Sequence, residues 1–258
     1  MFEISLSGKT ALVTGGARGI GAAACKKLAA AGANIVVNYY DCEPDREALK
    51  ELIPYLESLG VKAIACKADV SKEDEVNAMV AEAEKVFGGV DILVSNAGIT
   101  PVAKIEEMST DVWRRVMGVI LDGAFFATRA VLPYMLKKGW GRIVMITSNC
   151  AVNGGGGSAA YPAAKRGVEG LVKQLAYDYA NKGIRANIVR PAVVDTALLR
   201  ERYPSDADIA EYGKKLPVGH VGTVDDIANA VVFLSSDMVE YISGESIQVD
   251  GGRTLYKR

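Results

Sequence analysis

Two residues four apart, Tyr161 and Lys165, are the first candidates for chemistry in this sequence. The spacing places both side chains on one face of a helix, where an ammonium group can stabilise a phenolate. A tyrosine with an ordinary pKa of about 10 is a poor base at neutral pH, so such a neighbour helps it to exchange a proton. This pair of residues predicts proton transfer at an oxygen atom of a substrate.

A glycine-rich turn near the N-terminus is the second candidate site. It reads Thr14-Gly15-Gly16-Ala17-Arg18-Gly19-Ile20-Gly21, between a short apolar run and an alanine-rich helical pattern. Glycines allow a tight turn and let backbone N–H groups approach a pyrophosphate, while the helix N-terminus adds positive potential. We therefore expect Gly15, Gly19, Ile20 and Gly21 to bind a dinucleotide.

Short apolar, β-branched runs alternate with longer helical patterns, and together they would position both sites. The expected strands are residues 10–13, 35–38, 63–66, 92–95, 143–147, 186–190 and 246–249. Strand–helix–strand repeats with short links predict a sheet covered by helices on both faces. We expect an α/β fold: a single Rossmann-type, doubly wound domain over residues 1–258, with a mostly parallel seven-stranded sheet.

Apolar spacing, capping residues and glycine stops predict the main connecting helices. One helix begins at a capping-box-like Ser71 and ends at Gly88-Gly89, and the last begins at Thr223. Two more are expected over 112–138, with a bend near Pro133, and over 161–181. No linker, repeat or low-complexity segment divides the chain.

The set of motifs resembles the short-chain dehydrogenase/reductase family, in which a nicotinamide dinucleotide exchanges a hydride with a carbonyl or secondary alcohol. The resemblance covers essentially the whole chain. It implies that Ser148, Tyr161 and Lys165 are catalytic, with Tyr161 as acid/base, and that Tyr161 and Lys165 also contact the cofactor. Further cofactor contacts are implied after successive strands: Asp69 and Val70 beside the adenine, Asn96-Ala97-Gly98 on the cofactor floor, and Val194 and Thr196, after Pro191, at the carboxamide.

The choice between NAD and NADP should depend on the end of the second strand, near the adenosine ribose. Tyr39 stands where an NAD-selective member of the family usually has an acid, and Asp41 lies two residues further on. Arg18 can pair with a 2′-phosphate, although it could equally be a solvated loop charge. We predict that Arg18 and Tyr39 bind the cofactor and that NADP(H) is preferred over NAD(H).

Two positions depart from the family pattern. Ile120 stands where the family has an asparagine that positions a water between the lysine and solvent, and its side chain cannot hydrogen-bond water. Either the backbone carbonyl near 120 holds the water, or Asp122 substitutes for the asparagine, or proton delivery limits turnover. The last case keeps a second hypothesis open, a cofactor-binding redox sensor with little turnover. Ala192 replaces a usual glycine, so a slight shift of that loop is expected.

Two segments are predicted to form the substrate side. Gly154 to Gly157 should leave an open or mobile wall beside the reacting carbonyl, or form only a long turn. Residues 195–217 are polar and are expected to form a mobile lid. In this lid, Leu198 and Leu199 could face an apolar part of the substrate, and Arg200 or Arg202 could bind a carboxylate or phosphate. These features conflict, so the expected partner is a small carbonyl or alcohol compound of unspecified class.

Composition and charge argue against several classes of protein. Thirty basic and 31 acidic residues give a net charge of −1, which disfavours a nucleic-acid partner. No apolar run approaches the roughly 18 residues of a membrane span and no signal peptide is evident, so a cytoplasmic protein without a membrane partner is expected. A single histidine, His220, and four scattered cysteines predict neither a metal site nor disulfides. The family resemblance implies a homotetramer or homodimer.

Overall fold

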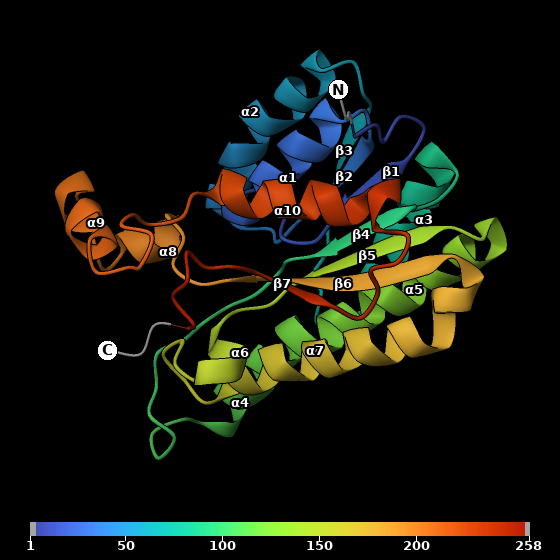
Figure 1. Cartoon of the computed structure of the whole chain (residues 1–258). Helices are drawn as coiled ribbons and strands as arrows, with labels where there is room; N and C mark the ends of the chain where they lie inside the picture. The colour runs from blue at the N-terminus through green and yellow to red at the C-terminus, as the bar shows by residue number, and fades with distance from the viewer. Residues whose placement is uncertain (1–3, 256–258) are drawn as a thin grey trace.

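The computed structural model describes residues 4–255 of the 258-residue chain. Its seven strands form one sheet in the order β3-β2-β1-β4-β5-β6-β7 (Figure 1). The strands are β1 Thr10–Val13, β2 Asn34–Tyr39, β3 Ala63–Lys67, β4 Ile92–Ser95, β5 Gly141–Ile146, β6 Ile184–Pro191 and β7 Ser246–Val249. Every neighbouring pair is parallel, so the predicted Rossmann-type α/β fold is confirmed, and the sheet is wholly rather than mostly parallel.

The central strands are buried on both faces, which explains why their sequences are uniformly apolar rather than alternating. Leu12 and Leu93 point into one core, while their neighbours Val13 and Val94 point into the other. All four side chains are fully buried. Each face of the sheet must therefore be covered by helices.

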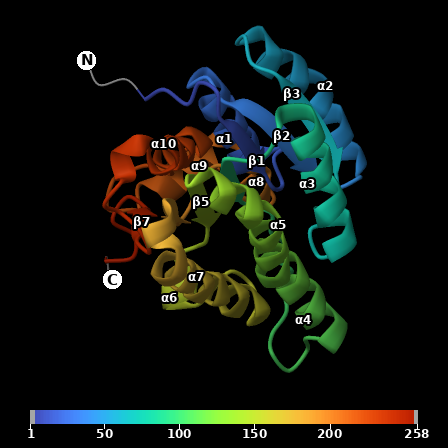
Figure 2. The same ribbon diagram turned by 90° about the vertical axis from the view of Figure 1, so that its right-hand side faces the viewer.

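Helices cover the two faces as two separate layers (Figures 1 and 2). One layer contains α1 Gly19–Ala30, α2 Glu43–Ser58 and α10 Val224–Ser235; the other contains α3 Glu73–Phe87, α4 Thr110–Met117, α5 Gly123–Lys138 and α7 Ala160–Tyr179. The short helices α6 Cys150–Asn153, α8 Ala197–Arg200 and α9 Asp206–Gly213 follow β5 and β6, and α8 and α9 project from the main body in Figure 1.

The long helical stretch Thr110–Lys138 is irregular at its middle. A π-helical turn, Gly118–Asp122, joins α4 to α5, whereas α5 continues through Pro133, so the irregularity lies away from the predicted position. By length and composition this stretch is the one helix among residues 4–255 that could cross a membrane. Its buried residues belong to the core beneath the sheet, as expected for a central helix of a folded domain.

The strand order creates a switch point between β1 and β4. The chain runs from β1 through β2 to β3 on one side and then returns to β4 on the other. The connections after these two strands therefore diverge, and ligands of open α/β sheets bind in the crevice that results. The glycine turn follows β1 and Asn96-Ala97-Gly98 follows β4, so the fold brings these two predicted cofactor segments together.

Candidate active site

Two adjoining cavities open at the carboxyl ends of the strands. The larger, of about 890 Å³, is lined by Ser148, Tyr161 and Lys165. The smaller, of about 510 Å³, is lined by the glycine turn and Asp69. Five residues line both cavities: Ile20, Asn96, Gly98, Ile99 and Thr196. One elongated molecule can therefore extend from one cavity into the other.

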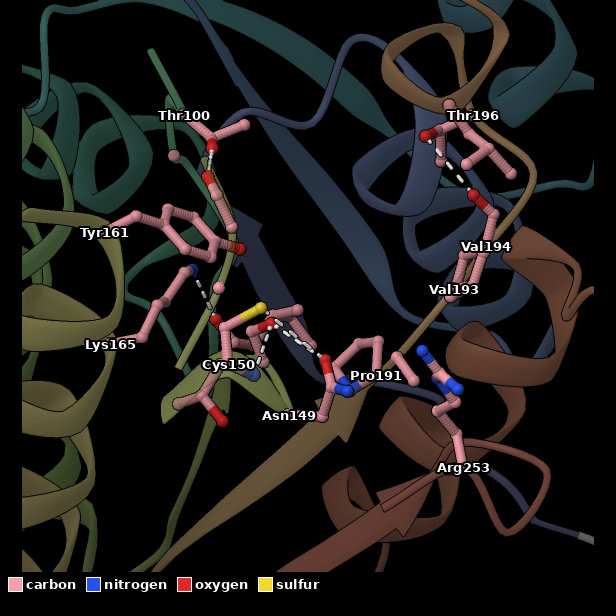
Figure 3. A pocket seen from close by; sticks show the side chains of 18 of the residues that line it. Thr100, Asn149, Cys150, Tyr161, Lys165, Pro191, Val193, Val194, Thr196 and Arg253 are labelled. Atoms are coloured by element: carbon pink, nitrogen blue, oxygen red, sulfur yellow. Dashed lines mark hydrogen bonds between the residues drawn. The ribbon is translucent and has the colours of Figure 1, made fainter. Parts of the chain in front are cut away.

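Tyr161 and Lys165 project into the larger cavity from the first turns of α7 (Figure 3). The buried Lys165 ammonium donates to the Ile146 carbonyl oxygen at 2.7 Å and lies 5.8 Å from the centre of the Tyr161 ring. Burial lowers the pKa of Lys165 to about 8. Burial also raises the pKa of Tyr161 to about 12, against a lowering by its hydrogen bond with Ser148. At neutral pH the tyrosine is therefore a phenol.

Ser148 follows β5 and is held where a substrate oxygen can approach the Tyr161 hydroxyl. Its hydroxyl oxygen accepts a hydrogen bond from the backbone N–H of Cys150 at 3.2 Å. The preceding residue, Thr147, donates to the buried carboxylate of Glu169 on α7, which also accepts from Arg190 of β6 at 2.8 Å. This carboxylate ties α7, which carries Tyr161 and Lys165, to the end of β5, which precedes Ser148, and to β6.

The four-glycine segment gives the Tyr161 ring the space that it occupies. All four glycines have φ between +75° and +95°, a region that side chains other than glycine rarely adopt. A Cβ on Gly156 would lie 2.5 Å from Tyr161 Cδ1, whereas a Cβ on Gly154 would meet nothing within 4 Å. The Gly156 carbonyl accepts from the Thr100 hydroxyl, and the Gly157 carbonyl accepts from the Ala103 N–H at 3.0 Å. The segment is therefore hydrogen-bonded to the loop after β4 and is more than an open wall.

The glycine turn has the geometry that an anionic pyrophosphate requires. A Cβ on Gly21 would lie 2.1 Å from the Gly15 carbonyl oxygen, so no larger residue fits there. Asn96 Nδ2 donates to that same carbonyl at 3.0 Å, which makes Asn96 a brace for the turn. Helix α1 begins at Gly19 with no side-chain N-cap and no acidic residue in its first turn. The unpaired N–H groups of this helix end are therefore left for an anion, and the pyrophosphate of a dinucleotide fits them.

The predicted adenine-side residues Asp69 and Val70 line the smaller cavity. Asp69 accepts from Arg115 at 2.7 Å, and hydrogen bonds from Ser71 and Arg115 lower the pKa of its carboxyl despite burial. Tyr39 does not line this cavity, whereas Tyr40 does. Successive side chains of an extended strand point in opposite directions, which explains why only one of these two tyrosines faces the cavity.

Arg18 lies at the same cavity but has a partner that the sequence pattern did not reveal. Its Nε donates to Asp45 Oδ1 at 2.6 Å, and the other oxygen of Asp45 accepts from the Tyr40 N–H at 3.2 Å. Asp45 is buried in the first turn of α2, while the Arg18 side chain is 50% exposed. The ribose end of the cavity therefore contains both a cation and a carboxylate.

The segment after β6 forms the wall opposite Tyr161 (Figure 3). Val194 and Thr196, both predicted to contact the cofactor, line the larger cavity. Val194 pairs with Gly222 in an isolated parallel bridge, which holds this segment against the C-terminal part of the chain. Among residues 4–255 only glycines have positive φ, so the backbone at Ala192 is one that alanine adopts without strain. The structure gives no reason for a shift of the loop at this position.

Ile120 lies in the π-helical turn, close to the buried end of Lys165. A Cβ built on Gly98 would be 3.6 Å from Lys165 Nζ and 3.7 Å from Ile120 Cγ1, so both side chains border one small space. Ile120 is 2% exposed. Asp122 is exposed, and its carboxylate lies near Gly118 rather than near Lys165. Its position does not support Asp122 as the substitute for asparagine.

In the predicted lid, the structure distinguishes between the two arginines. Arg200 donates to both oxygens of Asp195 and, at 2.7 Å, to Asp206, so its charge is used within the lid. Arg202 lines the larger cavity and forms no ion pair with the residues that the structure describes. Leu199 lines this cavity too, while the side chain of Leu198 is outside the described part of the structure.

Several cavity residues were not predicted from the sequence. Tyr40, Asp45 and Arg115 line the smaller cavity, and Arg253 lines the larger one. Asp45 could have been found from the sequence as an acidic residue in the first turn of the helix that follows β2. Arg253 directly follows the sequence Asp250-Gly251-Gly252. Within residues 4–255, no three His, Cys, Asp or Glu side chains are grouped to hold a metal ion.

Comparison with known proteins gives matches along nearly the whole chain. The family model described as enoyl-(acyl carrier protein) reductase matches residues 15–254. The 3beta-hydroxysteroid dehydrogenase 1 of Eggerthella lenta is 38% identical, covering 97% of this chain and 95% of that protein. The 3-oxoacyl-[acyl-carrier-protein] reductase FabG of Aquifex aeolicus is 36% identical over 97% and 99%. A gluconate 5-dehydrogenase of Burkholderia cenocepacia, solved with NADP and tartrate, superposes with a TM-score of 0.89 at 35% identity over 98% of each chain.

Proposed function

The chain belongs to the short-chain dehydrogenase/reductase family and is an NAD(P)-dependent oxidoreductase, and on that premise we propose that Tyr161 is its acid/base. The nicotinamide supplies or accepts the hydride, and the substrate is a small molecule with a carbonyl or secondary alcohol. The observation that carries the proposal is the position of the Tyr161 ring in the larger cavity, beside Ser148 and the Lys165 side chain.

In the direction of carbonyl reduction, Tyr161 donates its phenolic proton to the oxygen while the hydride reaches the carbon. The raised pKa of Tyr161 keeps it protonated at neutral pH, which is the form that this direction needs. Ser148 donates a hydrogen bond to the same oxygen and stabilises its developing charge. The Lys165 ammonium stabilises the phenolate that remains, and it contacts the nicotinamide ribose.

The same proposal assigns the cofactor contacts. Gly15, Gly19, Ile20 and Gly21 hold the pyrophosphate at the start of α1, and Asp69 and Val70 flank the adenine. Ala97 and Gly98 support the middle of the cofactor, with Asn96 bracing the turn, and Val194 and Thr196 hold the carboxamide. The continuity of the two cavities through Ile20, Gly98 and Thr196 supports this path.

For the choice of cofactor we propose NADP(H) over NAD(H), with Asp45 limiting the preference. Arg18 offers its remaining N–H groups to a 2′-phosphate, while the adjacent Asp45 carboxylate repels that phosphate. Arg18→Ala should raise the KM for NADPH far more than that for NADH. Asp45→Asn should lower the KM for NADPH, because it removes the repelling charge. Equal effects of Arg18→Ala on both cofactors would refute the preference.

The decisive test is Tyr161→Phe, which keeps the ring and removes the proton. We expect NADPH-dependent turnover of ketones, oxoacyl thioesters or keto sugars by the wild type and loss of turnover in the variant, with the cofactor Kd little changed. The alternative, a cofactor-binding redox sensor, depends on Ile120 beside Lys165. Tight cofactor binding by the wild type without turnover of any of these compounds would favour the sensor.

Four broader features belong to the same proposal. The chain acts as one domain, residues 195–217 close over the larger cavity as a lid, the protein is cytoplasmic, and it assembles as a homotetramer or homodimer. Exposed aromatic side chains support assembly, since Tyr177 on α7 is 87% exposed and Tyr241 is fully exposed in the single chain. Sedimentation equilibrium and limited proteolysis with and without cofactor test the assembly and the lid.

A further inference from the structure

The substrate end of the larger cavity carries positive charge without a compensating acid. Its lining residues include Arg202 from the lid and Arg253 from the C-terminal segment. None of the described residues that line this cavity is an aspartate or glutamate. The two guanidinium groups also form no ion pair with any residue in the range 4–255.

Two other cations of the same lid do have acidic partners. Arg200, two residues before Arg202, binds Asp195 and Asp206, and Lys214 binds Glu211 at 2.9 Å. The lid thus has enough acids to neutralise its cations, yet none is placed at Arg202. A cation at the wall of a binding cavity, with nothing beside it to accept its N–H groups, is suited to an anionic ligand.

Arg202 lies beside the glycine segment that also borders the Tyr161 ring. Its Nη2 atom lies 3.7 Å from where a Cβ on Gly157 would be, and the Tyr161 ring lies against the adjacent Gly156. Neighbouring Cα atoms are about 3.8 Å apart, so the guanidinium and the proposed acid/base flank consecutive residues. A substrate that meets both needs only a few bonds between its anion and its carbonyl.

Arg253 approaches the cavity from the opposite wall. Figure 3 shows its side chain beside Val193 and Pro191, across from Tyr161. The neighbouring lining groups of the lid are two tyrosines, Tyr203 and Tyr212, whose ring centres are 5.0 Å apart. The lid therefore contributes two phenol hydroxyls to the cavity besides the Arg202 cation.

We infer that the substrate is a short oxo or hydroxy acid whose carboxylate is bound by Arg202 and Arg253. The inference rests on the proposed function, because it places the carbonyl or alcohol of that acid at Tyr161 and Ser148. A planar guanidinium matches a carboxylate with two parallel hydrogen bonds. Closing the lid would bring Arg202 onto the anion, so substrate charge and lid position are coupled.

The test compares short 2-oxo, 3-oxo and 4-oxo acids with their methyl esters, which keep the carbonyl and lose the charge. We expect kcat/KM to be about 10- to 100-fold higher for the preferred acid than for its ester, since hydrogen bonds to charged groups are of that strength. Arg202→Ala and Arg253→Ala should raise the KM for the acid about tenfold or more and leave the ester unchanged. Arg202→Lys should restore part of the loss.

Lys215→Ala is the matched control, because Lys215 is an exposed lid cation that does not line the cavity. It should leave the ratio of kcat/KM for the acid to kcat/KM for the ester unchanged. If this ratio fell as much as in Arg202→Ala, the effect would come from the general charge of the lid, and the inference would be overturned. Equal turnover of acids and esters, abolished by Tyr161→Phe, would overturn the anion site while the proposed function stands. Faster turnover of the matching keto phosphate would overturn the carboxylate assignment. No turnover of any compound would overturn both.

Discussion

Replacing Gly156 with alanine tests whether the glycine segment positions the Tyr161 ring. The new Cβ would lie 2.5 Å from Tyr161 Cδ1, and ordinary contact begins at 3.4 Å, so the ring must retreat by about 1 Å. A misplacement of this size can reduce the rate about 10²-fold. We therefore expect kcat/KM of Gly156→Ala to fall about 100-fold, mainly in kcat, with the cofactor Kd little changed.

The chain itself offers controls for backbone strain. Gly154 has φ of +75° and Gly156 has φ of +77°, so alanine is strained at both, by about 1–2 kcal/mol. A Cβ on Gly154 would meet nothing, and one on Gly155 would make an ordinary contact with Cys150 Sγ at 3.7 Å. These two variants should lose stability as Gly156→Ala does, but should keep kcat/KM within a few fold of the wild type.

The assay is initial-rate NADPH oxidation at a temperature below the Tm of all three variants. The double variant Gly156→Ala/Tyr161→Phe provides a coupling test, because residues that act as a unit are not additive. It should be no slower than Tyr161→Phe alone. Equal losses in Gly154→Ala and Gly156→Ala, or full additivity in the double variant, would refute positioning of the ring by Gly156.

Three further predictions concern the surroundings of the site. With a carbonyl substrate that does not titrate, kcat/KM for reduction should be level below pH 8 and fall above it. The reason is that Lys165 has a pKa of about 8, so its ammonium is lost as the pH rises. A rate that still rises at pH 9 would contradict this. If proton delivery limits turnover, Ile120→Asn should raise kcat and change the solvent isotope effect. If kcat is unchanged and the wild type already turns over fast, the backbone carbonyl near residue 120 is favoured as the group that holds the water. Glu169→Ala should lower the free energy of unfolding by about 3–5 kcal/mol in urea titration. The change leaves Arg190, whose side chain is only 11% exposed, without its buried partner. A loss below 1 kcal/mol would show that water replaces the carboxylate.

The strands were predictable because their signal is local. Mainly apolar runs such as β1 and β4 lie in the centre of the sheet, and their bounds agree with the sequence prediction at both ends. Residues 112–138 were also predicted to be helical, but the π-helical turn Gly118–Asp122 was not predicted, since no local pattern distinguishes it from an α-helix. Proline was the visible candidate for a bend, and α5 accommodates it.

At the site, the sequence by itself determined which groups can do the chemistry. Glycine positions, the Tyr161–Lys165 spacing and the order of motifs after successive strands are properties of the chain, so the family and the nucleotide-dependent redox activity followed from them. The three predicted catalytic residues line one cavity, and their roles remain for Tyr161→Phe and the pH profile to test.

Only the tertiary structure decided which of the charged side chains form ion pairs with one another. Asp45 lies next to Arg18, and Asp195 and Asp206 neutralise Arg200, while Arg202 remains at the cavity. In the sequence the three aspartates look alike, and so do the three arginines. The physical reason is that an ion pair, a pKa shifted by burial and the space left for a side chain all depend on atoms brought together from distant segments. Spacing along the chain predicts that a charge is present, and the fold determines which charge remains available to a ligand.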